Sequence, residues 1–348
     1  LTEEELDNLD KNTLFIIAHN YFNSSKLFLN KKNFHNVDDC IKIFNKINLG
    51  DLEIQFNEYE SQNFKREIDW YTADTKKERS TDESFLQLKC IDIMITEKCS
   101  MKCKDCANLM QYYIKPENTD IEILFKSIDR LMSAIEHLYE FRVLGGDPFM
   151  NKDIHKVIDK LKEYNKVKKI IVYTNAKIIP KGNNLECLKH EKVILDVTNY
   201  GEASNKHDEL LEVLEKNEIA YSTALTTKWQ DCGTILPFQK RTEEEKEKKF
   251  SNCCNSDLLS LLHGKLYRCP FSANGTNLKA MPNDKSDIVD LIDDSITNEE
   301  ITRQIKSLVY DKKYLTACSY CNGRDYDVPV IKAAEQSSKP IPFKIQSE

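Results

Sequence analysis

Three cysteines, Cys99, Cys103 and Cys106, carry the clearest chemical signal in this chain of 348 residues. They follow an apolar run, residues 91–95, which predicts a buried β-strand that ends just before the first cysteine. Three thiolates with the spacing CxxxCxxC can each bind one iron of a [4Fe-4S] cluster, which leaves the fourth iron without a protein ligand. Because an open iron can chelate a small molecule, the pattern predicts a reactive iron-sulfur centre rather than a simple electron carrier.

A second signal follows the next predicted strand, residues 141–144. The sequence Gly145-Gly146-Asp147-Pro148 places two residues without side chains next to a carboxylate. Glycines let backbone carbonyls approach a ligand closely, and a carboxylate suits an ammonium group. Polar side chains at the ends of two later strands can bind the same ligand through hydrogen bonds. These polar residues are Thr174, Asn175 and Thr198.

A further set of cysteines lies in the C-terminal third of the chain. An adjacent pair, a single cysteine and a distant CxxC could supply four thiolates to one closed site. The candidate ligands are Cys253 or Cys254, Cys269, Cys318 and Cys321. On residue types alone, a structural zinc ion and a second [4Fe-4S] cluster both remain open. Separately, Cys232 follows Trp229 in a predicted loop and is a candidate catalytic residue, as a donor of a hydrogen atom to a bound substrate.

Strands and helices alternate from residue 89 onward, which predicts parallel β/α units. Thr119 and Glu122 have the spacing of a capping box at the start of an amphipathic helix, and Thr297 and Glu300 have the same spacing later. The cysteine loop and the Gly-Gly-Asp-Pro sequence both follow predicted strands, where barrels of the TIM type place their chemistry. The expected strands are residues 91–95, 141–144, 169–173, 193–197 and 218–224.

Composition argues against several classes of partner. The formal net charge is −7, so we expect no nucleic-acid partner, because phosphate binding normally needs a basic surface. No apolar run reaches about 18 residues, so we expect no membrane span. Twelve cysteines without an export signal favour metal-binding thiols in the reducing cytoplasm. The polar opening residues 1–12 do not have the pattern of a signal peptide, and we expect the chain to be a fragment or a trimmed product.

The segment 96–106, TEKCSMKCKDC, resembles the cluster-binding signature of the radical SAM superfamily. By this resemblance, residues 145–148 correspond to a Gly-Gly-Glu-Pro loop that holds the methionyl amino group of S-adenosylmethionine, with Asp147 in place of the glutamate. The resemblance also implies that polar residues at the later strand ends contact the ribose or the carboxylate of that cofactor. The C-terminal cysteine order resembles the twitch extension, a SPASM-like domain in which four thiolates hold an auxiliary [4Fe-4S] cluster, and it favours Cys253 as the first ligand.

We expect an α/β fold of five segments, of which the resemblance implies the barrel and the auxiliary cluster domain. Residues 1–58 form a short, truncated α/β remnant that resembles Rossmann-like domains, and residues 59–88 form a linker. Residues 89–237 form a partial TIM-like (β/α)6 radical SAM barrel. Residues 238–334 form the small auxiliary cluster domain, and residues 335–348 form a tail.

The function that the resemblance implies is reductive cleavage of S-adenosylmethionine to a 5′-deoxyadenosyl radical, which then removes hydrogen from a small molecule. Sequences such as CANLM at 106–110 and CPFSAN at 269–274 resemble proteins of surface-polysaccharide synthesis. We therefore expect oxidation or epimerisation of a sugar-like substrate such as a nucleotide-linked sugar, with flavodoxin or ferredoxin as the low-potential electron donor. The alternatives are a peptide maturase and a non-catalytic metal-binding protein.

Overall fold

The computed structural model describes residues 6–17, 29, 32–35, 37–39, 86–256, 258–325 and 328–346. The chain divides into two compact units, Leu1–Ser84 and Phe85–Glu348. In the smaller unit, strand β1 (Phe15–Ile17) pairs in parallel with β2 (Val37–Asp39). Residues 40–58 of the expected remnant and residues 59–85 of the expected linker lie outside the described residues. The predicted segment boundaries remain predictions.

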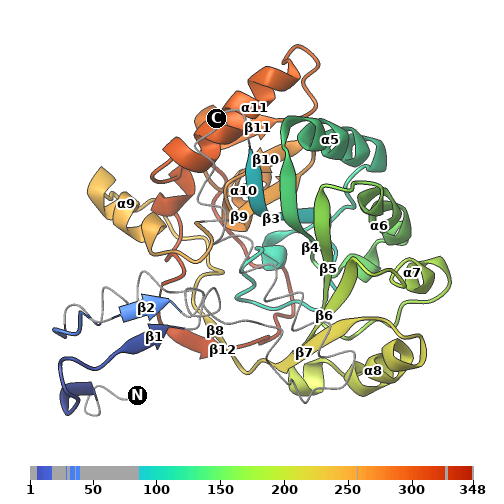
Figure 1. The fold of residues 1–348 in the computed structure, drawn as a ribbon, viewed down its shortest axis with the longest axis horizontal. Coiled ribbons are helices and arrows are strands. Elements are labelled where there is room, and N and C mark those ends of the chain that lie inside the picture. The colour runs from blue at the N-terminus through green and yellow to red at the C-terminus, as the bar shows by residue number, and fades with distance from the viewer. Residues whose placement is uncertain are drawn as a thin grey trace. The chain divides into compact units, whose positions relative to one another are not determined.

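The larger unit is built on an eight-stranded sheet, shown in Figure 1. Its strand order is β11-β10-β9-β3-β4-β5-β6-β7, and the strands from β9 to β7 in this order run parallel to their neighbours. The bounds are β3 (Gln87–Thr96), β4 (His137–Gly145), β5 (Val167–Thr174), β6 (Val193–Asn199), β7 (Tyr221–Leu225), β9 (Leu258–Leu262), β10 (Lys265–Tyr267) and β11 (Ile288–Asp290).

The parallel sheet confirms the predicted α/β class, with one difference in where a strand comes from. Among the described residues, β3 to β7 are the five strands that the sequence predicts, and β9 is a sixth parallel strand. This strand comes from the C-terminal part of the chain and pairs with β3, so it extends the sheet on the side opposite to β7. The sequence of β9, LLSLL, is short and buried, and a short apolar run does not show with which strand it pairs.

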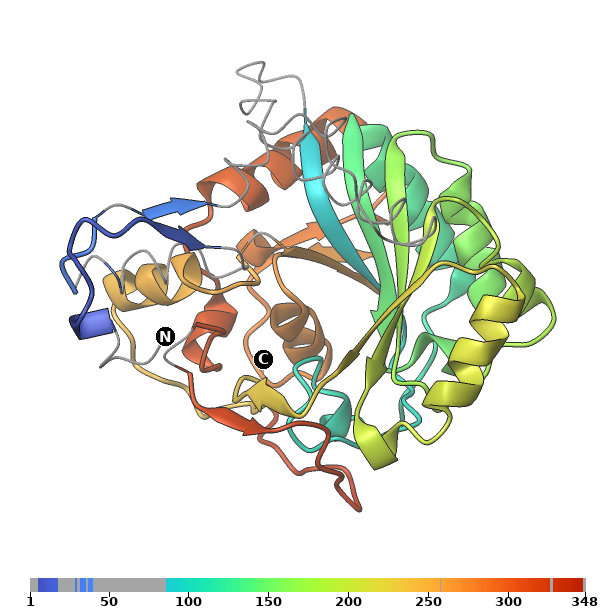
Figure 2. The same cartoon turned by 60° about the horizontal axis from the view of Figure 1, so that its bottom comes forward.

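Helices cover one face of the parallel strands in Figures 1 and 2. Their bounds are α5 (Ile121–Ala134), α6 (Ile154–Lys162), α7 (Asn183–Glu186) and α8 (His207–Lys216). Alternate residues of β3, Ile91, Ile93 and Ile95, belong to the same buried cluster as the apolar side of α5. The residues between them, such as Asp92, therefore face the other side of the sheet.

The N-terminal cap of α5 differs from the predicted one. Asp120 is the capping residue, because its carboxylate accepts hydrogen bonds from the backbone N–H groups of Glu122 and Ile123. Thr119 is not available for this role, since its hydroxyl donates to the carbonyl of Met94, at 2.7 Å. The later prediction is confirmed: the hydroxyl of Thr297 accepts from the backbone of Glu300 and caps α11 (Asn298–Lys306).

Among the C-terminal elements, α11 packs against α5, whereas the segment around Ala273 packs on the opposite face of the sheet with Met94 and Leu144. A tight hairpin joins β9 and β10, and its two turn residues, His263 and Gly264, have φ values of 47° and 81°. The sequence around Cys269 then starts α10 (Pro270–Asn277). The other elements of this part are α9 (Glu243–Ser251) and the antiparallel pair β8 (Lys228–Gln230) and β12 (Val330–Lys332).

The last described residues pack against the larger unit. The backbone N–H of Ile341 donates to the carbonyl of Gln111, at 2.8 Å. The ring of Phe343 meets the ring of Tyr112 edge-on, with a centroid distance of 5.4 Å. Within the described ranges, every helix is too short or too polar to cross a lipid bilayer.

Candidate functional site

The cysteine loop begins where β3 ends, at the carboxyl edge of the parallel sheet. Hydrogen-bond donors surround two of its thiols: the backbone N–H of Met101 and the amide of Asn175 point at the sulfur of Cys99, at 3.4 and 3.6 Å. The amide of Gln336 donates to the sulfur of Cys103, at 3.2 Å. Such N–H···S contacts are typical of thiolates that bind iron-sulfur clusters, because they spread the negative charge of the centre.

The Gly-Gly-Asp-Pro turn at the end of β4 is docked directly on the start of the cysteine loop. The N–H of Gly146 donates to the carbonyl of Thr96, and the N–H of Asp147 donates to the carbonyl of Lys98, each at 2.9 Å. Any side chain at the two glycines would clash, since a Cβ atom at Gly145 would lie 2.0 Å from the Thr96 oxygen and one at Gly146 would lie 2.1 Å from the Lys98 oxygen. The glycines are therefore required for the close approach of two backbones.

Asp147 links the end of β4 to the end of β5. Its carboxylate is 1% exposed and accepts hydrogen bonds from the N–H of Phe149, the hydroxyl of Thr174 and the N–H of Asn175, at 3.0, 3.0 and 3.2 Å. Burial raises the pKa of this carboxyl group. The direct contact to a cofactor that the resemblance implies for Asp147 stays a prediction.

The other predicted cofactor contacts lie near the same edge. The side-chain oxygen of Asn175 accepts from the hydroxyl of Ser100, at 3.1 Å, while its amide faces Cys99. Thr198 lies at the end of β6, where its backbone carbonyl accepts from the hydroxyl of Ser204. Pro148 opens the short turn Pro148–Met150 that follows the docked glycines. The structure thus gathers the sequence-predicted residues at one edge of the sheet, and their roles remain predictions.

Glu97 is a residue of this site that the sequence analysis did not single out. Its buried carboxylate accepts from the backbone N–H of Glu117, at 2.8 Å, and from the amide of Asn277, also at 2.8 Å. The ring of His263 lies 3.1 Å from the same carboxylate. Glu97 therefore connects the cysteine loop to the β9–β10 hairpin and to α10. Its position two residues before Cys99 is the only sequence signal, since its partners lie far away in the chain.

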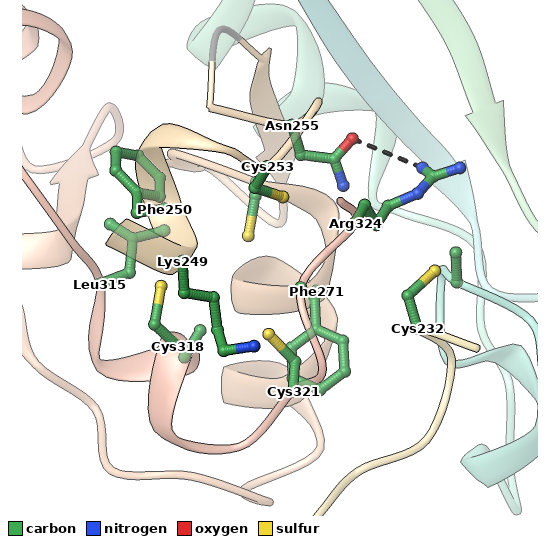
Figure 3. A pocket seen from close by; sticks show the side chains of 14 residues that line it. Cys232, Lys249, Phe250, Cys253, Asn255, Phe271, Leu315, Cys318, Cys321 and Arg324 are labelled. Atoms are coloured by element: carbon green, nitrogen blue, oxygen red, sulfur yellow. Dashed lines mark hydrogen bonds between the residues drawn. The ribbon is translucent and has the colours of Figure 1, made fainter. Parts of the chain in front are cut away.

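Five cysteines line one cavity in the C-terminal part, drawn in Figure 3. They are Cys232, Cys253, Cys269, Cys318 and Cys321. The thiol of Cys269 caps α10 and accepts from the N–H of Ser272, at 3.3 Å. Arg241 donates to the carbonyls of Cys318 and Cys321 and so holds the CxxC turn. The cavity thus offers a thiol-rich site with cationic support.

Cys253 and Cys254 differ in their placement. Cys253 lines the cavity, whereas the thiol of Cys254 contacts the side chain of Asn255 instead. Cys232 lies beside Arg324, away from Cys318 and Cys321 in Figure 3. The residue after Cys232 is packed against the first cysteine loop, because a Cβ at Gly233 would lie 2.2 Å from the carbonyl oxygen of Asp105. Cys232 therefore lies between the two groups of cysteines.

The thiols carry protons at neutral pH while no metal is bound. Burial raises the pKa of Cys99 and raises that of Cys103 to about 11. Burial likewise raises the pKa values of Cys253 and Cys321 to about 12. Metal binding must displace these protons. Within the described part of the chain, no three Cys, His, Asp or Glu side chains converge closely enough to hold a single metal ion.

A row of polar side chains lies on the face of the sheet that faces away from α5. Ser260, Asp92 and Arg142 are neighbours in register across β9, β3 and β4, and Arg142 forms an ion pair with Glu140. Asp92 is 4% exposed and Ser260 is 0% exposed, yet one carboxylate oxygen of Asp92 and the hydroxyl of Ser260 have no hydrogen-bond partner. Burial, opposed by Arg142, raises the pKa of Asp92 to about 7. Unpaired buried polar atoms are costly in a protein without a ligand, so this row is a candidate binding surface.

Comparison with known proteins gives a family match, curated relatives and similar solved structures. A family described as a 4Fe-4S single cluster domain matches residues 88–219. The chain is 27% identical over 237 residues to the radical SAM cyclopropyl synthase TigE of Paramaledivibacter caminithermalis, which covers 60% of this chain and 49% of that protein. It is 27% identical over 133 residues to the GTP 3′,8-cyclase of Helicobacter pylori, which covers 37% of this chain and 39% of the enzyme. The chain therefore spans half or less of the length of these relatives.

A similar solved structure is that of BtrN in complex with AdoMet and 2-DOIA. It has a TM-score of 0.42 and 15% sequence identity, and it covers 72% of this chain and 97% of that protein.

Proposed function

Since this chain belongs to the radical SAM superfamily, we propose that Cys99, Cys103 and Cys106 hold a [4Fe-4S] cluster whose open iron binds S-adenosylmethionine. The observation that carries this proposal is the direct docking of the Gly-Gly-Asp-Pro turn on the cysteine loop through two backbone hydrogen bonds of 2.9 Å. This contact brings the proposed metal ligands and the proposed cofactor loop together. When bound, the two cofactors supply an electron and a sulfonium bond whose cleavage yields a 5′-deoxyadenosyl radical.

The protein residues then orient the reactants. Asn175 contacts the Cys99 thiol with its amide and the Asp147 carboxylate with its backbone N–H, so it couples the cysteine loop to the cofactor turn. The carboxylate of Asp147 also accepts a hydrogen bond from the hydroxyl of Thr174, so it holds the end of β5 against the end of β4. Fixed geometry of this kind matters because a radical reaction requires the reacting C–H bond to be held close to the oxidant.

We propose a second [4Fe-4S] cluster in the cavity of Figure 3, bound by Cys253, Cys269, Cys318 and Cys321. The lining of the cavity favours Cys253 over Cys254 as the first ligand. A cluster near the substrate could accept an electron and so turn hydrogen removal into a two-electron oxidation. Cys232, between the two cysteine groups, is the proposed donor of a hydrogen atom if the reaction is an epimerisation.

We propose a small, sugar-like substrate rather than a peptide. The support is the polar row of Ser260, Asp92 and Arg142, whose unpaired buried oxygen atoms suit the hydroxyl groups of a polar small molecule. A low-potential reductant such as flavodoxin or ferredoxin would supply the first electron, and we place the reaction in the cytoplasm. A peptide substrate is the competing proposal, and the experiment below separates the two.

The test is anaerobic reconstitution followed by product analysis. Wild-type protein should bind about eight irons per chain, and a Cys269→Ala variant should bind about four, because only the auxiliary cluster is lost. Reduction in the presence of S-adenosylmethionine should release 5′-deoxyadenosine, and nucleotide-linked sugars should stimulate this release more than short peptides do. Stimulation by peptides alone would refute the sugar proposal, and release by neither class above background would refute both.

A further inference from the structure

The first residues of the C-terminal segment after β12 pair with the first cysteine loop. The N–H of Lys104 donates to the carbonyl of Glu335, at 2.8 Å, and the N–H of Ser337 donates to the carbonyl of Lys102, at 2.6 Å. These bonds form an antiparallel bridge that sets Cys103 opposite Gln336. Residues 334–337, which we call the C-terminal latch, thus pair with the loop as a short strand would.

The side chain of Gln336 adds contacts that only an amide can make. Its carbonyl oxygen accepts from the backbone N–H of Lys102, at 2.8 Å, which fixes the orientation of the amide because a backbone N–H can only donate. Its NH₂ group must then face the other way, where it donates to the thiol of Cys103, at 3.2 Å, and to the carbonyl of Ala334, at 2.7 Å.

The latch is anchored independently of the loop. The strand β12 that precedes it pairs with β8, and the N–H of Ala333 donates to the carbonyl of Thr227, at 3.0 Å. Ala334 has a φ of 55°, which turns the chain from β12 toward the cysteine loop. An ion pair of 2.9 Å between Lys104 and Glu335 closes the outer side, where both side chains are more than 40% exposed. The exposed ion pair contributes little, so the amide and backbone contacts carry the attachment.

We infer that the C-terminal latch positions Cys103 for iron binding and that Gln336 tunes the first cluster through its N–H···S hydrogen bond. This inference rests on the proposed function, because it needs a cluster at Cys99, Cys103 and Cys106. Gln336 is a positioning residue, since it acts through a ligand rather than on the substrate. A hydrogen bond to a cluster sulfur favours the reduced, more negative form and therefore raises the reduction potential.

The test compares Gln336→Glu with Ser337→Ala. The glutamate can still accept from Lys102 but cannot donate to Cys103, and it adds a negative charge beside the cluster. We expect the equilibrium constant for reduction of the first cluster to fall about tenfold. This change lowers the reduction potential by about 59 mV for a one-electron couple. Ser337→Ala is the matched control, because the hydroxyl of Ser337 turns to the carbonyl of Lys339 and its backbone contacts are kept. It should leave the potential unchanged.

The readout is a potentiometric titration followed by electron paramagnetic resonance, using the reduced signal that changes when S-adenosylmethionine is added. Cluster loss in the presence of a chelator, followed by absorbance, should be faster in Gln336→Glu and in Gln336→Leu than in the control. If Gln336→Glu keeps no iron at the first site while the auxiliary site stays loaded, the latch is also supported, because none of the residues that line the auxiliary cavity belongs to it.

The failure of this inference can be told apart from the failure of the proposed function. Wild-type protein that binds no cluster at the three cysteines would refute the proposed function. Wild-type protein that binds this cluster, with a potential and a loss rate that do not respond to either change at Gln336, would overturn only the latch.

Discussion

Replacing Gly146 by alanine tests whether the two loops of the first site must be in backbone contact. An added Cβ would lie 2.1 Å from the carbonyl oxygen of Lys98 and 2.9 Å from the backbone nitrogen of Cys99. These distances are well below an ordinary contact, so the loops must move apart by about 1 Å. The movement would break the hydrogen bonds from Gly146 to Thr96 and from Asp147 to Lys98, both 2.9 Å long.

The cost can be estimated from these contacts. Two lost hydrogen bonds cost about 1 kcal/mol each, and forcing extra volume into a packed contact costs about 1–3 kcal/mol. We therefore expect Gly146→Ala to lower the free energy of unfolding of the larger unit by about 3–5 kcal/mol. Because Cys99 would shift with the loop, cleavage of S-adenosylmethionine should fall about 100-fold, as expected for a misplacement of about 1 Å at a reaction site.

Chemical denaturation of the iron-free protein measures the first effect, and release of 5′-deoxyadenosine by the reconstituted protein measures the second. Gly182→Ala is the matched control, because a Cβ there meets nothing within 4 Å although φ is +55°. The control should lose about 1–3 kcal/mol, because its backbone (φ 55°, ψ −133°) is strained for a residue with a side chain, and it should keep its activity. A Gly146→Ala protein with the stability of the control and full activity would refute the argument that the loops must touch.

Two further predictions concern the proposed substrate site. Asp92→Asn should stabilise the protein above pH 7 by an amount on the order of a few kcal/mol, because the wild-type carboxylate is charged and buried there. Because the pKa of Asp92 is about 7 in the folded protein against an ordinary value of 3.8, this residue contributes stability below about pH 4 that is lost as the pH rises to about 7, so the advantage of the variant should grow across this range. The same variant should lose substrate-stimulated release of 5′-deoxyadenosine, and equal stability of the two proteins at pH 5 and pH 8 would contradict the burial argument. Cys232→Ala should abolish incorporation of deuterium from D₂O into the product if the reaction is an epimerisation, whereas an unchanged product would exclude Cys232 as the hydrogen donor.

The sequence could predict those parts of the site whose residues are close together in the chain. Cys99, Cys103 and Cys106 form one short segment that follows a strong apolar strand, and the two glycines before Asp147 follow the next strand. The parallel α/β sheet was predictable for the same reason, since each β/α unit carries its own periodic pattern.

The parts that could not be predicted depend on distant partners. Gln336 contacts Cys103 across 233 residues of sequence, and Glu97 contacts Asn277 across 180. No local sequence pattern predicts either contact, because both depend on how the C-terminal elements pack on the parallel strands. The origin of β9 and the capping role of Asp120 were missed for a similar reason, since Thr119 is drawn into a tertiary hydrogen bond with Met94.

The central claim is that the first cluster has an open iron that binds S-adenosylmethionine. The most direct measurement is electron-nuclear double resonance on the reduced protein with S-adenosylmethionine that carries ¹⁵N in its amino group. We expect a hyperfine coupling between the cluster and this nitrogen, and it should disappear in a Cys103→Ala variant. A reduced cluster that shows no coupling to the label, or a zinc ion in place of iron at Cys99, Cys103 and Cys106, would contradict the central claim.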